Sequence, residues 1–428
     1  MIYQIFVDRF SKSDQNMPVK PWDSPVEGAR NEFYGGNIMG IISKADYISS
    51  LGADAIYLTP IFASQTYHRY DILDYFKIDP IAGNDEDFDE MVKVFHSKGI
   101  KIFLDGVFNH VNVNSEMAEK FGTKNRWRNF DLVELDLDRM DVMNFIIEVV
   151  EYWMKRGIDG FRIDCANDIG MKHLDRIMDI IHRFNGEMIG EVMTYAKDWL
   201  DHMDGVMNYF FRKSTLSLLR GELSVGDYVT FINWMMEEYP YDKLLKSWTI
   251  LSSHDTPRLS YVLGDERRVR LGIAIQYAFP GIPMVYYGEE IEMNGGPDPF
   301  NRAPMKWDQK SERIDFYRQM ENIRKKFNVF SKGKTKIWKS GSTIAILRYD
   351  SWENFVIFAG NISNSANVAN IMIPYSYAFD GLELIDALNP DRKAKISSGS
   401  LIAEFEPFDF AFFVPQDNVP YYTFFNHR

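Results

Sequence analysis

Short apolar runs alternate with amphipathic segments along the first three quarters of the chain. The runs have the length of buried strands and are bounded by Gly, Pro, Asp or Asn. They lie at residues 2–7, 54–59, 100–105, 161–164, 188–191, 206–210, 248–253 and 282–287. Between them, apolar residues recur at helical spacing, at residues 42–51, 85–98, 140–156, 171–184, 266–279 and 311–327. Strands that alternate with helices predict parallel βαβ units.

Eight such strands predict a closed (β/α)₈ TIM barrel over residues 1–332, with a short insertion after the third strand at residues 111–138. A doubly wound open sheet is the alternative topology. We favour the barrel because polar residues follow at least six different strands, and the single crevice of an open sheet draws on fewer strand ends.

The pattern changes after residue 332. Residues 333–428 carry short, alternating, turn-bounded apolar segments, which predict a C-terminal antiparallel β-sandwich domain. The expected strands lie at residues 336–338, 344–349, 355–358, 368–373, 382–385 and 410–414.

Net charge and cysteine content limit the kinds of ligand and the cellular compartment that we expect for this protein. With 48 basic and 61 acidic residues the net charge is −13, which opposes binding to nucleic acid or to an anionic membrane and favours a neutral ligand. The single cysteine, Cys165, excludes an intrachain disulfide and fits a reducing compartment. The first residues show no signal-peptide pattern, and no run of about 18 apolar residues predicts a membrane span. We therefore expect a cytoplasmic protein.

The stretch Gly157–Asp168 contains the first chemical signal. Arg162 and Asp164 lie two residues apart on the expected fourth strand, so their side chains point to the same side. A salt bridge at a strand end explains such a pair as well as an active site does. The next residue, Cys165, is either a small buried filler, which we favour, or a nucleophile.

Charged and histidine side chains also lie at the ends of other expected strands. The carboxyl ends of barrel strands meet on one face, so residues from separate strands should converge there. These residues are Asp105 and His110 after the third strand, Arg162 and Asp164 on the fourth, Glu191 on the fifth, and His254 and Asp255 after the seventh. A hydrolytic metal site is one interpretation, but the histidines lie on separate strand ends rather than in a close pair.

Acid/base chemistry by carboxylates is the second interpretation. It needs one ionised carboxylate that attacks and one protonated carboxyl that donates to a leaving oxygen. Arg162 would lower the pKa of Asp164 and keep it ionised. Glu191 follows the apolar run Met188–Gly190, which would favour its protonated form. Asp255, beside His254, would stabilise positive charge on a sugar ring.

Four segments, taken together, resemble the alpha-amylase family, glycoside hydrolase family 13. They are Asp105–His110, Gly160–Asp164, Gly190–Val192 and Ser253–Asp255. The resemblance implies that Asp164 is the nucleophile, Glu191 the acid/base and Asp255 the transition-state stabiliser. It also implies retention of the α-configuration through a covalent glycosyl-enzyme, with the two carboxyl groups about 5–5.5 Å apart.

Finer features look most like the branch of neopullulanases, cyclomaltodextrinases and maltogenic amylases. They are the segments Tyr3–Phe10, Tyr67–Asp71, Ser253–Arg258 and Pro280–Glu289. The resemblance implies that Tyr70 stacks on the sugar at the cleaved position and His68 bonds its hydroxyls. Asp298 and Arg302 would bind the next sugar outward, and Asn167 and Asp168 would line the leaving-group side. The full expected substrate-binding set is His68, Tyr70, Asp105, His110, Arg162, Asn167, Asp168, His254, Asp298 and Arg302.

The sequence departs from this branch in three places. The chain starts on the first barrel strand, without the N-terminal domain that builds the branch's dimer, so we expect a monomer or a dimer formed in another way. The short insertion predicts a more open cleft. Met193 stands where the branch often has Trp.

We predict no cofactor and no essential calcium. Asn109 matches a calcium ligand of the family, but the insertion that supplies its partner ligands is reduced, and Asn37 stands where an Asp ligand is common. A chelator that lowers the melting temperature by more than about 5 °C would contradict this prediction.

Three functional hypotheses follow. The first is a hydrolase of α-1,4-glucosidic bonds in maltooligosaccharides, cyclodextrins or starch fragments, with or without transglycosylation. The second is a 4-α-glucanotransferase or an α-glucosyl isomerase on the same site. The third is a non-catalytic carbohydrate-binding barrel, which we disfavour because Asp164, Glu191 and Asp255 are all present.

Overall fold

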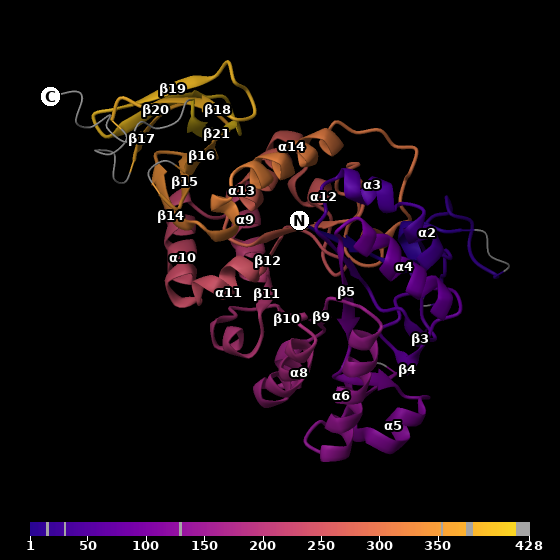
Figure 1. The fold of residues 1–428 in the computed structure, drawn as a ribbon. Helices are drawn as coiled ribbons and strands as arrows, with labels where there is room; N and C mark the ends of the chain where they lie inside the picture. Colours follow the sequence, from indigo (N-terminus) through magenta and orange to yellow (C-terminus); the bar gives the residue numbers. More distant parts are fainter. Residues whose placement is uncertain (14–16, 30, 128–130, 352–353, 374–379, 417–428) are drawn as a thin grey trace.

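A closed barrel of eight parallel strands forms the centre of the computed structural model (Figure 1). The structure describes residues 1–428 except 14–16, 30, 128–130, 352–353, 374–379 and 417–428. In chain order the barrel strands are β1 (Ile2–Ile5), β2 (Ala55–Leu58), β5 (Lys101–Gly106), β9 (Gly160–Ile163), β10 (Glu187–Val192), β11 (Gly205–Asn208), β12 (Trp248–Ile250) and β13 (Ile282–Tyr286). Strands β13 and β2 pair with β1 from its two sides and close the ring, which confirms the predicted barrel.

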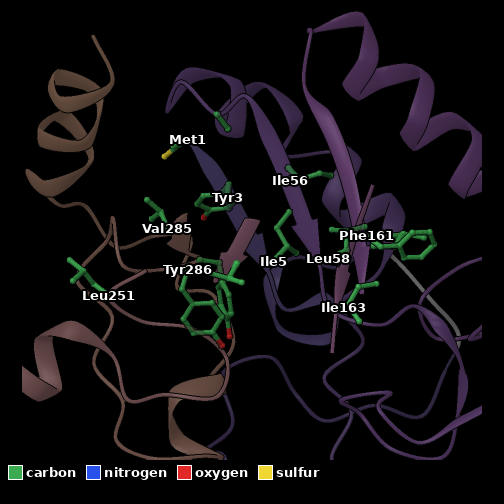
Figure 2. Packing of buried hydrophobic residues seen from close by; sticks show 14 of the residues in the cluster. Met1, Tyr3, Ile5, Ile56, Leu58, Phe161, Ile163, Leu251, Val285 and Tyr286 are labelled. Carbon is green, nitrogen blue, oxygen red and sulfur yellow. The ribbon is translucent and has the colours of Figure 1, made fainter. Parts of the chain in front are cut away.

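Alternation along the strands separates two apolar layers. Inward-facing residues such as Ile2, Tyr57 and Trp248 pack together inside the barrel. Their neighbours point outward to the surrounding helices, as Tyr3, Ile5, Ile56, Leu58, Phe161, Ile163 and Val285 do in Figure 2. Strands that are buried on both faces explain why the sequence shows continuous apolar runs.

Helices and short 3-10 turns surround the barrel. They are α1 (Val7–Phe10), α2 (Ile38–Ile42), α3 (Ala45–Ser50), α4 (Asp85–Ser97), α6 (Met140–Lys155), α7 (Ala166–Ile169), α8 (Met171–Arg183), η2 (Lys197–His202), α9 (Tyr209–Arg220), α10 (Val225–Glu238), α11 (Tyr241–Lys246), α12 (Leu259–Leu263), α13 (Glu266–Ala278), η3 (Phe300–Arg302), α14 (Arg313–Lys326) and α15 (Val329–Lys332).

Several sequence predictions of element boundaries were wrong. The strands expected at residues 2–7 and 248–253 end at Ile5 and Ile250. The expected helix at residues 42–51 is two short helices, α2 and α3. The expected strand at residues 206–210 stops at Asn208, because the Asn208 side chain accepts a hydrogen bond from Phe211 N and caps α9. The structure also contains α9, α10 and α11 between β11 and β12, where we had predicted no helix.

Two small antiparallel sheets extend the barrel on the side of α4 and α6. One is the hairpin of β3 (Phe62–Ser64) and β4 (Ile72–Ile78). The other is the predicted insertion, which consists of β6 (His110–Asn112), α5 (Glu116–Phe121), β7 (Gly122–Arg126) and β8 (Leu132–Leu135), with β8 central. One face of this sheet buries Val111, Val133 and Leu135, which leaves the other face for the cavity described below.

The C-terminal strands form one antiparallel ladder in the order β14-β15-β16-β21-β18-β19-β20-β17. They are β14 (Lys334–Ser340), β15 (Thr343–Tyr349), β16 (Phe355–Asn361), β17 (Asn367–Met372), β18 (Glu383–Asp386), β19 (Lys393–Ser397), β20 (Ser400–Phe405) and β21 (Phe410–Pro415). The ladder curls over an apolar core, and its ends meet where Ser340 Oγ donates to Asn370 O at 2.6 Å. The predicted antiparallel fold is confirmed, although we had missed β19 and β20.

No helix among the described residues is both long and apolar enough to cross a membrane.

Candidate active site

Arg162 is the centre of the polar cluster at the carboxyl end of the barrel. It lies on β9 between β5 and β10 and is fully buried. Its Nη1 donates to Asp105 Oδ1 at 2.8 Å and to Asp164 Oδ1 at 2.9 Å, and its Nη2 is 2.9 Å from Glu191 Oε1. One guanidinium therefore holds carboxylates from three adjacent strands, which explains why a core strand carries the Arg162–Asp164 pair.

Glu191 is oriented by two further groups. The Cys165 N–H donates to Glu191 Oε2 at 3.0 Å, and the Tyr209 hydroxyl donates to Oε1 at 3.3 Å. Cys165 has a left-handed backbone, with φ of 45°, at the turn from β9 into α7. The residue is of intermediate exposure and lines the cavity, and its role as a filler stays a prediction. The turn aims a backbone donor at the neighbouring carboxylate.

Asp255 belongs to a second cluster, with His254 and Arg302. His254 Nε2 is 2.9 Å from Asp255 Oδ2, and Arg302 Nη2 donates to Asp255 Oδ1 at 3.0 Å. Arg302 also pairs with Asp298 at 3.0 Å, and Gln4 Nε2 is 2.7 Å from His254 Nδ1. Burial alone would raise the pKa of Asp255, but His254 and Arg302 hold it well below its ordinary value. Asp255 is therefore a carboxylate at neutral pH.

Tyr70 connects the two clusters. Its hydroxyl donates to Asp105 Oδ2 at 2.7 Å and is 2.6 Å from His254 Nε2. Its ring lies parallel to the His254 ring, with centroids 5.4 Å apart. The Tyr70 N–H donates to His68 Nδ1 at 3.1 Å, so His68 and Tyr70 lie side by side. Asp105 also accepts from the Tyr57 hydroxyl at 2.6 Å.

The pKa of Asp164 differs from the sequence prediction. Burial raises this pKa well above its ordinary value, and the carboxylates Glu191, Asp105 and Asp255 raise it further. Arg162 lowers it, but this cation is shared with Asp105 and Glu191. The prediction that Arg162 holds the pKa of Asp164 low was therefore wrong, because sequence spacing does not reveal how many anions divide one guanidinium.

A cavity of about 750 Å³ opens above these clusters. Nine of the predicted site residues line it: His68, Tyr70, His110, Asp164, Asn167, Glu191, Asp255, Asp298 and Arg302. Asp105, Arg162 and His254 lie beneath this lining, fully buried or nearly so. Arg162 contacts the lining carboxylate Asp164 and His254 contacts Asp255, whereas Asp105 contacts Arg162 and the Tyr70 hydroxyl. Asp168 is exposed and accepts a hydrogen bond from Asn167 Nδ2 at 3.0 Å. The cavity has room for a ligand of several sugar units.

Sequence reasoning missed several contributors. Gln4 and Tyr57 occupy neighbouring inward positions of β1 and β2 and touch the two clusters. Side chains two positions apart on a strand point the same way, so each of these polar residues could have been predicted to face into the barrel from the apolar inward residue two positions before it. Tyr209 lies just beyond the end of β11 and has a similar signal. Trp127, in the insertion, lines the cavity and carried no sequence signal that we recognised.

The residues do not fit a calcium ion at the first-loop position. Asn37 Oδ1 accepts from Gly40 N at 2.7 Å and caps α2, and it also accepts from Ser13. At the other position Asn109 is buried, with no hydrogen-bond partner for its Nδ2 among the described residues. Within the described part of the chain, the one group of three His, Cys, Asp or Glu ligands is Asp164, Cys165 and Glu191. Calcium independence stays a prediction.

Comparison with known proteins extends this description. The family model described as "Alpha amylase, catalytic domain" matches residues 4–131 and 127–337. Neopullulanase 2 of Thermoactinomyces vulgaris is 32% identical over 79% of this chain and 64% of its own length. The cyclomaltodextrinase of Thermoanaerobacter pseudethanolicus is 32% identical over 85% of this chain and 70% of its own. This chain thus spans about two thirds of either relative.

A solved structure is similar over almost the whole chain. It is the cyclic alpha-maltosyl-(1→6)-maltose hydrolase from Arthrobacter globiformis in its ligand-free form, with a TM-score of 0.86 and 26% identity. The similarity covers 96% of this chain and 97% of that one. Both the barrel and the C-terminal sheet are therefore shared.

Proposed function

The chain belongs to the alpha-amylase family of glycoside hydrolases, and from this premise we propose that it is a retaining hydrolase of α-1,4-glucosidic bonds. One observation carries the proposal. A carboxylate oxygen of Asp164 and one of Glu191 lie within 4.8 Å of each other, in one cavity. A separation near 5 Å suits attack by one carboxylate, whereas inverting glycosidases keep their carboxyl groups about 6.5–9.5 Å apart to hold a water.

Asp164 and Glu191 divide the chemistry. In the first step Asp164 attacks the anomeric carbon, the glycosidic C–O bond breaks, and Glu191 transfers its proton to the leaving oxygen. In the second step water attacks the same carbon, the ester to Asp164 breaks, and Glu191 takes the water proton back. Two inversions give overall retention. The backbone N–H of Cys165 and the Tyr209 hydroxyl hold Glu191 in place through both steps.

The remaining charges stabilise the transition state. Asp255 stays ionised between His254 and Arg302, so its negative charge faces the oxocarbenium-like sugar. Arg162 compensates the carboxylates that crowd Asp164. Binding of a neutral sugar removes water from the cavity without adding a like charge to this cluster.

We propose maltooligosaccharides, cyclodextrins and starch fragments as substrates, because relatives matched over most of the chain carry the names neopullulanase and cyclomaltodextrinase. His68 and Tyr70 would contact the sugar at the cleaved bond, Asp298 and Arg302 the next sugar, and Asn167 the leaving group. We take residues 1–332 as the catalytic barrel and 333–428 as the C-terminal domain. We also propose a cytoplasmic location, which a chain with one cysteine fits.

Three measurements test this function. Proton NMR of the first products from maltotriose should show the α-anomer before mutarotation, and an initial β-anomer would contradict the mechanism. Glu191→Gln should lower turnover by orders of magnitude with an unchanged melting temperature. Chromatography of products from maltotriose, β-cyclodextrin and pullulan identifies the reaction. Glucose and maltose indicate hydrolysis, whereas longer chains from maltotriose indicate a 4-α-glucanotransferase.

A further inference from the structure

The loop at residues 65–71 forms one side of the catalytic cavity and contains one buried cation. Every residue of this loop lines the cavity except Arg69, which is 1% exposed and lies behind it. The Arg69 N–H donates to Thr66 O at 3.2 Å and closes a turn, in which Arg69 has a left-handed backbone with φ of 60°. The turn thus places Tyr70 on the cavity side and the Arg69 guanidinium on the interior side.

Asp79 is the charged partner of Arg69. It directly follows β4, and its Oδ1 is 3.2 Å from Arg69 Nε, with both residues nearly fully buried. Asp79 is itself fixed, because its N–H donates to Ile61 O at 2.8 Å and its Oδ1 accepts from Ile81 N at 3.1 Å. The ion pair therefore ties the cavity loop to a well-held point at the end of the β3–β4 hairpin.

Arg69 is a costly residue for this position. A left-handed backbone is unfavourable for a residue with a side chain, whereas glycine adopts it freely. Burial of a guanidinium is also costly. Arg69 Nη2 has no hydrogen-bond partner among the described residues, and Nη1 makes only a long contact of 3.5 Å to Tyr67 O. Such costs concentrate at functional sites, where the surrounding structure holds a strained conformation in place.

The charge of Arg69 also acts on a second buried carboxylate. Burial raises the pKa of Asp8, and Arg9 and Arg69 both lower it. Removal of Arg69 would therefore leave both Asp8 and Asp79 with less compensating charge, and we expect it to lower stability as well. An experiment on Arg69 has to separate this loss of stability from a loss of position in the cavity.

Tyr70 is the cavity residue whose position this ion pair controls. Its hydroxyl donates to Asp105 Oδ2 at 2.7 Å and lies 2.6 Å from His254 Nε2. Under the proposed function Tyr70 contacts the sugar at the cleaved bond, so it sets where the anomeric carbon lies relative to Asp164. A displacement of about 1 Å at such a place can cost about 100-fold in rate.

We propose that Arg69 is a positioning residue of the proposed glucan hydrolase, whose ion pair with Asp79 holds Tyr70 where it aligns the sugar with Asp164. The inference rests on the proposed function and adds to it, because it assigns a role to a side chain that lies outside the cavity lining. Arg69 acts on the reaction through Tyr70. Its loss should lower kcat more than it raises KM, since a misplaced sugar still binds but reacts slowly.

Arg69→Gly is the first test. Glycine adopts the left-handed backbone without strain, so this variant removes the guanidinium and keeps the turn. On maltotriose we expect kcat to fall about 100-fold and KM to rise less than about fivefold. Arg69→Lys should keep kcat within about fivefold of the wild-type value, because an ammonium group can still pair with Asp79. Circular dichroism and melting temperatures show whether each variant folds.

Double-mutant cycles test whether Arg69 acts through Tyr70 and Asp79. In a Tyr70→Ala background, Arg69→Gly should lower kcat by less than about threefold further, because the group that Arg69 positions is already absent. Asp79→Asn keeps the shape of the side chain and removes its charge. It should lower kcat about tenfold when Arg69 is present and less than about twofold in Arg69→Gly.

Two variants are matched controls. Arg348→Ala removes another fully buried arginine, which donates to the carbonyls of Val329 and Phe330 and is outside the cavity lining. It should lower the melting temperature and leave kcat of the folded protein unchanged. Asn185→Gly relieves another left-handed backbone, with φ of 58°, and should also leave kcat unchanged.

Three results would overturn the proposal. One is a folded Arg69→Gly protein whose kcat lies within about threefold of wild type, another is a loss confined to KM, and the third is a pair of losses from Arg69→Gly and Tyr70→Ala that multiply. If Arg69→Gly does not fold, Asp79→Asn decides, and wild-type kcat in that variant overturns the proposal.

The same measurements separate this proposal from the proposed function. Wild-type protein that converts no α-glucan would refute the proposed function. Normal wild-type turnover together with unaltered Arg69 and Asp79 variants would refute only the role of Arg69.

Discussion

The mouth of the barrel and the core of the C-terminal sheet both bury side chains, but the mouth buries charged ones and the core of the sheet buries apolar ones. The C-terminal sheet buries a cluster of apolar side chains that includes Phe355, Ile357 and Phe413. At the barrel mouth, Arg162 is buried among Asp105, Asp164 and Glu191.

The charged side chains that the C-terminal domain does bury form hydrogen bonds with backbone groups. Arg348 Nη2 donates to the carbonyls of Val329 and Phe330, and Asp386 Oδ1 accepts from Leu388 N and Phe412 N. At the mouth, by contrast, Asp164, Glu191 and Asp255 line the cavity. Buried charge that faces a cavity costs stability and provides chemistry, whereas buried apolar surface provides stability alone. The following four experiments test this contrast.

The largest expected effect is the loss of turnover in Asp164→Asn. Without a nucleophile, kcat on maltotriose should fall by about 10⁴-fold or more. The raised pKa means that the folded protein holds this proton more tightly than the unfolded chain does, so the contribution of Asp164 to stability falls as pH rises. The substitution should therefore increase the unfolding free energy at pH 7 by about 1 kcal/mol, and by less in acid. Urea denaturation at two pH values measures this change in unfolding free energy.

Asp386→Asn is the matched control for this experiment, since Asp386 is also a buried carboxylate but supports the C-terminal sheet. It should leave kcat unchanged. A large loss of kcat in this variant, or full activity in Asp164→Asn, would contradict the division between the two regions.

Arg162→Met should damage both activity and stability. It removes the cation shared by Asp105, Asp164 and Glu191 and leaves three buried carboxylates without that compensating charge. We expect a loss of about 3–5 kcal/mol in unfolding free energy at neutral pH, which becomes smaller in acid as the carboxylates take up protons. Denaturant titrations at two pH values measure both quantities. A loss that grows in acid would contradict the account.

Phe413→Ala should reduce stability without affecting catalysis. Phe413 is fully buried on β21 and pairs with Ile357 and Asp386 on the neighbouring strands. The cavity should cost about 3–5 kcal/mol, while kcat of the folded fraction at low temperature stays at the wild-type value. Ile402→Ala is the control, because Ile402 is 62% exposed on β20 and should change stability by less than about 0.5 kcal/mol.

The smallest expected effect is a pH shift in Asp105→Asn. The Asp105 carboxylate raises the pKa of Asp164, so its removal should lower that pKa. Because Asp164 must be ionised to attack, the acid limb of kcat/KM should move to lower pH, by about one unit. A pH profile with a chromogenic maltoside measures the limb. A limb that stays in place or moves to higher pH would contradict this account of the Asp164 pKa.

Most of the fold was predictable because buried strands and amphipathic helices carry strong periodic signals. All eight barrel strands were found to within three residues at either end, and β11 ends early because Asn208 caps α9. Strands β19 and β20 were missed because their alternation is weak: the inward positions include the small residues Ala394 and Ala403, and the outward residue Ile402 is apolar. A weak alternation of this kind is hard to distinguish from a polar loop.

The candidate site was partly predictable for a different reason. Asp105, Arg162, Glu191 and Asp255 occupy strand ends, and barrel topology brings strand ends together whatever their separation in the chain. The contributions of Gln4, Tyr57 and Trp127 depend on which side chains meet across the barrel mouth.

The sequence by itself determined the architecture, the family and the set of carboxylates, because apolar periodicity and strand-end motifs are local properties of the chain. Only the tertiary structure decided how those carboxylates share charge. It placed three of them on one Arg162 guanidinium, reversed the expected direction of the Asp164 pKa, and aimed the Cys165 N–H at Glu191. It also set Trp127 against His110. Electrostatic energy depends on all neighbours and on burial, and neither is a property of any single segment.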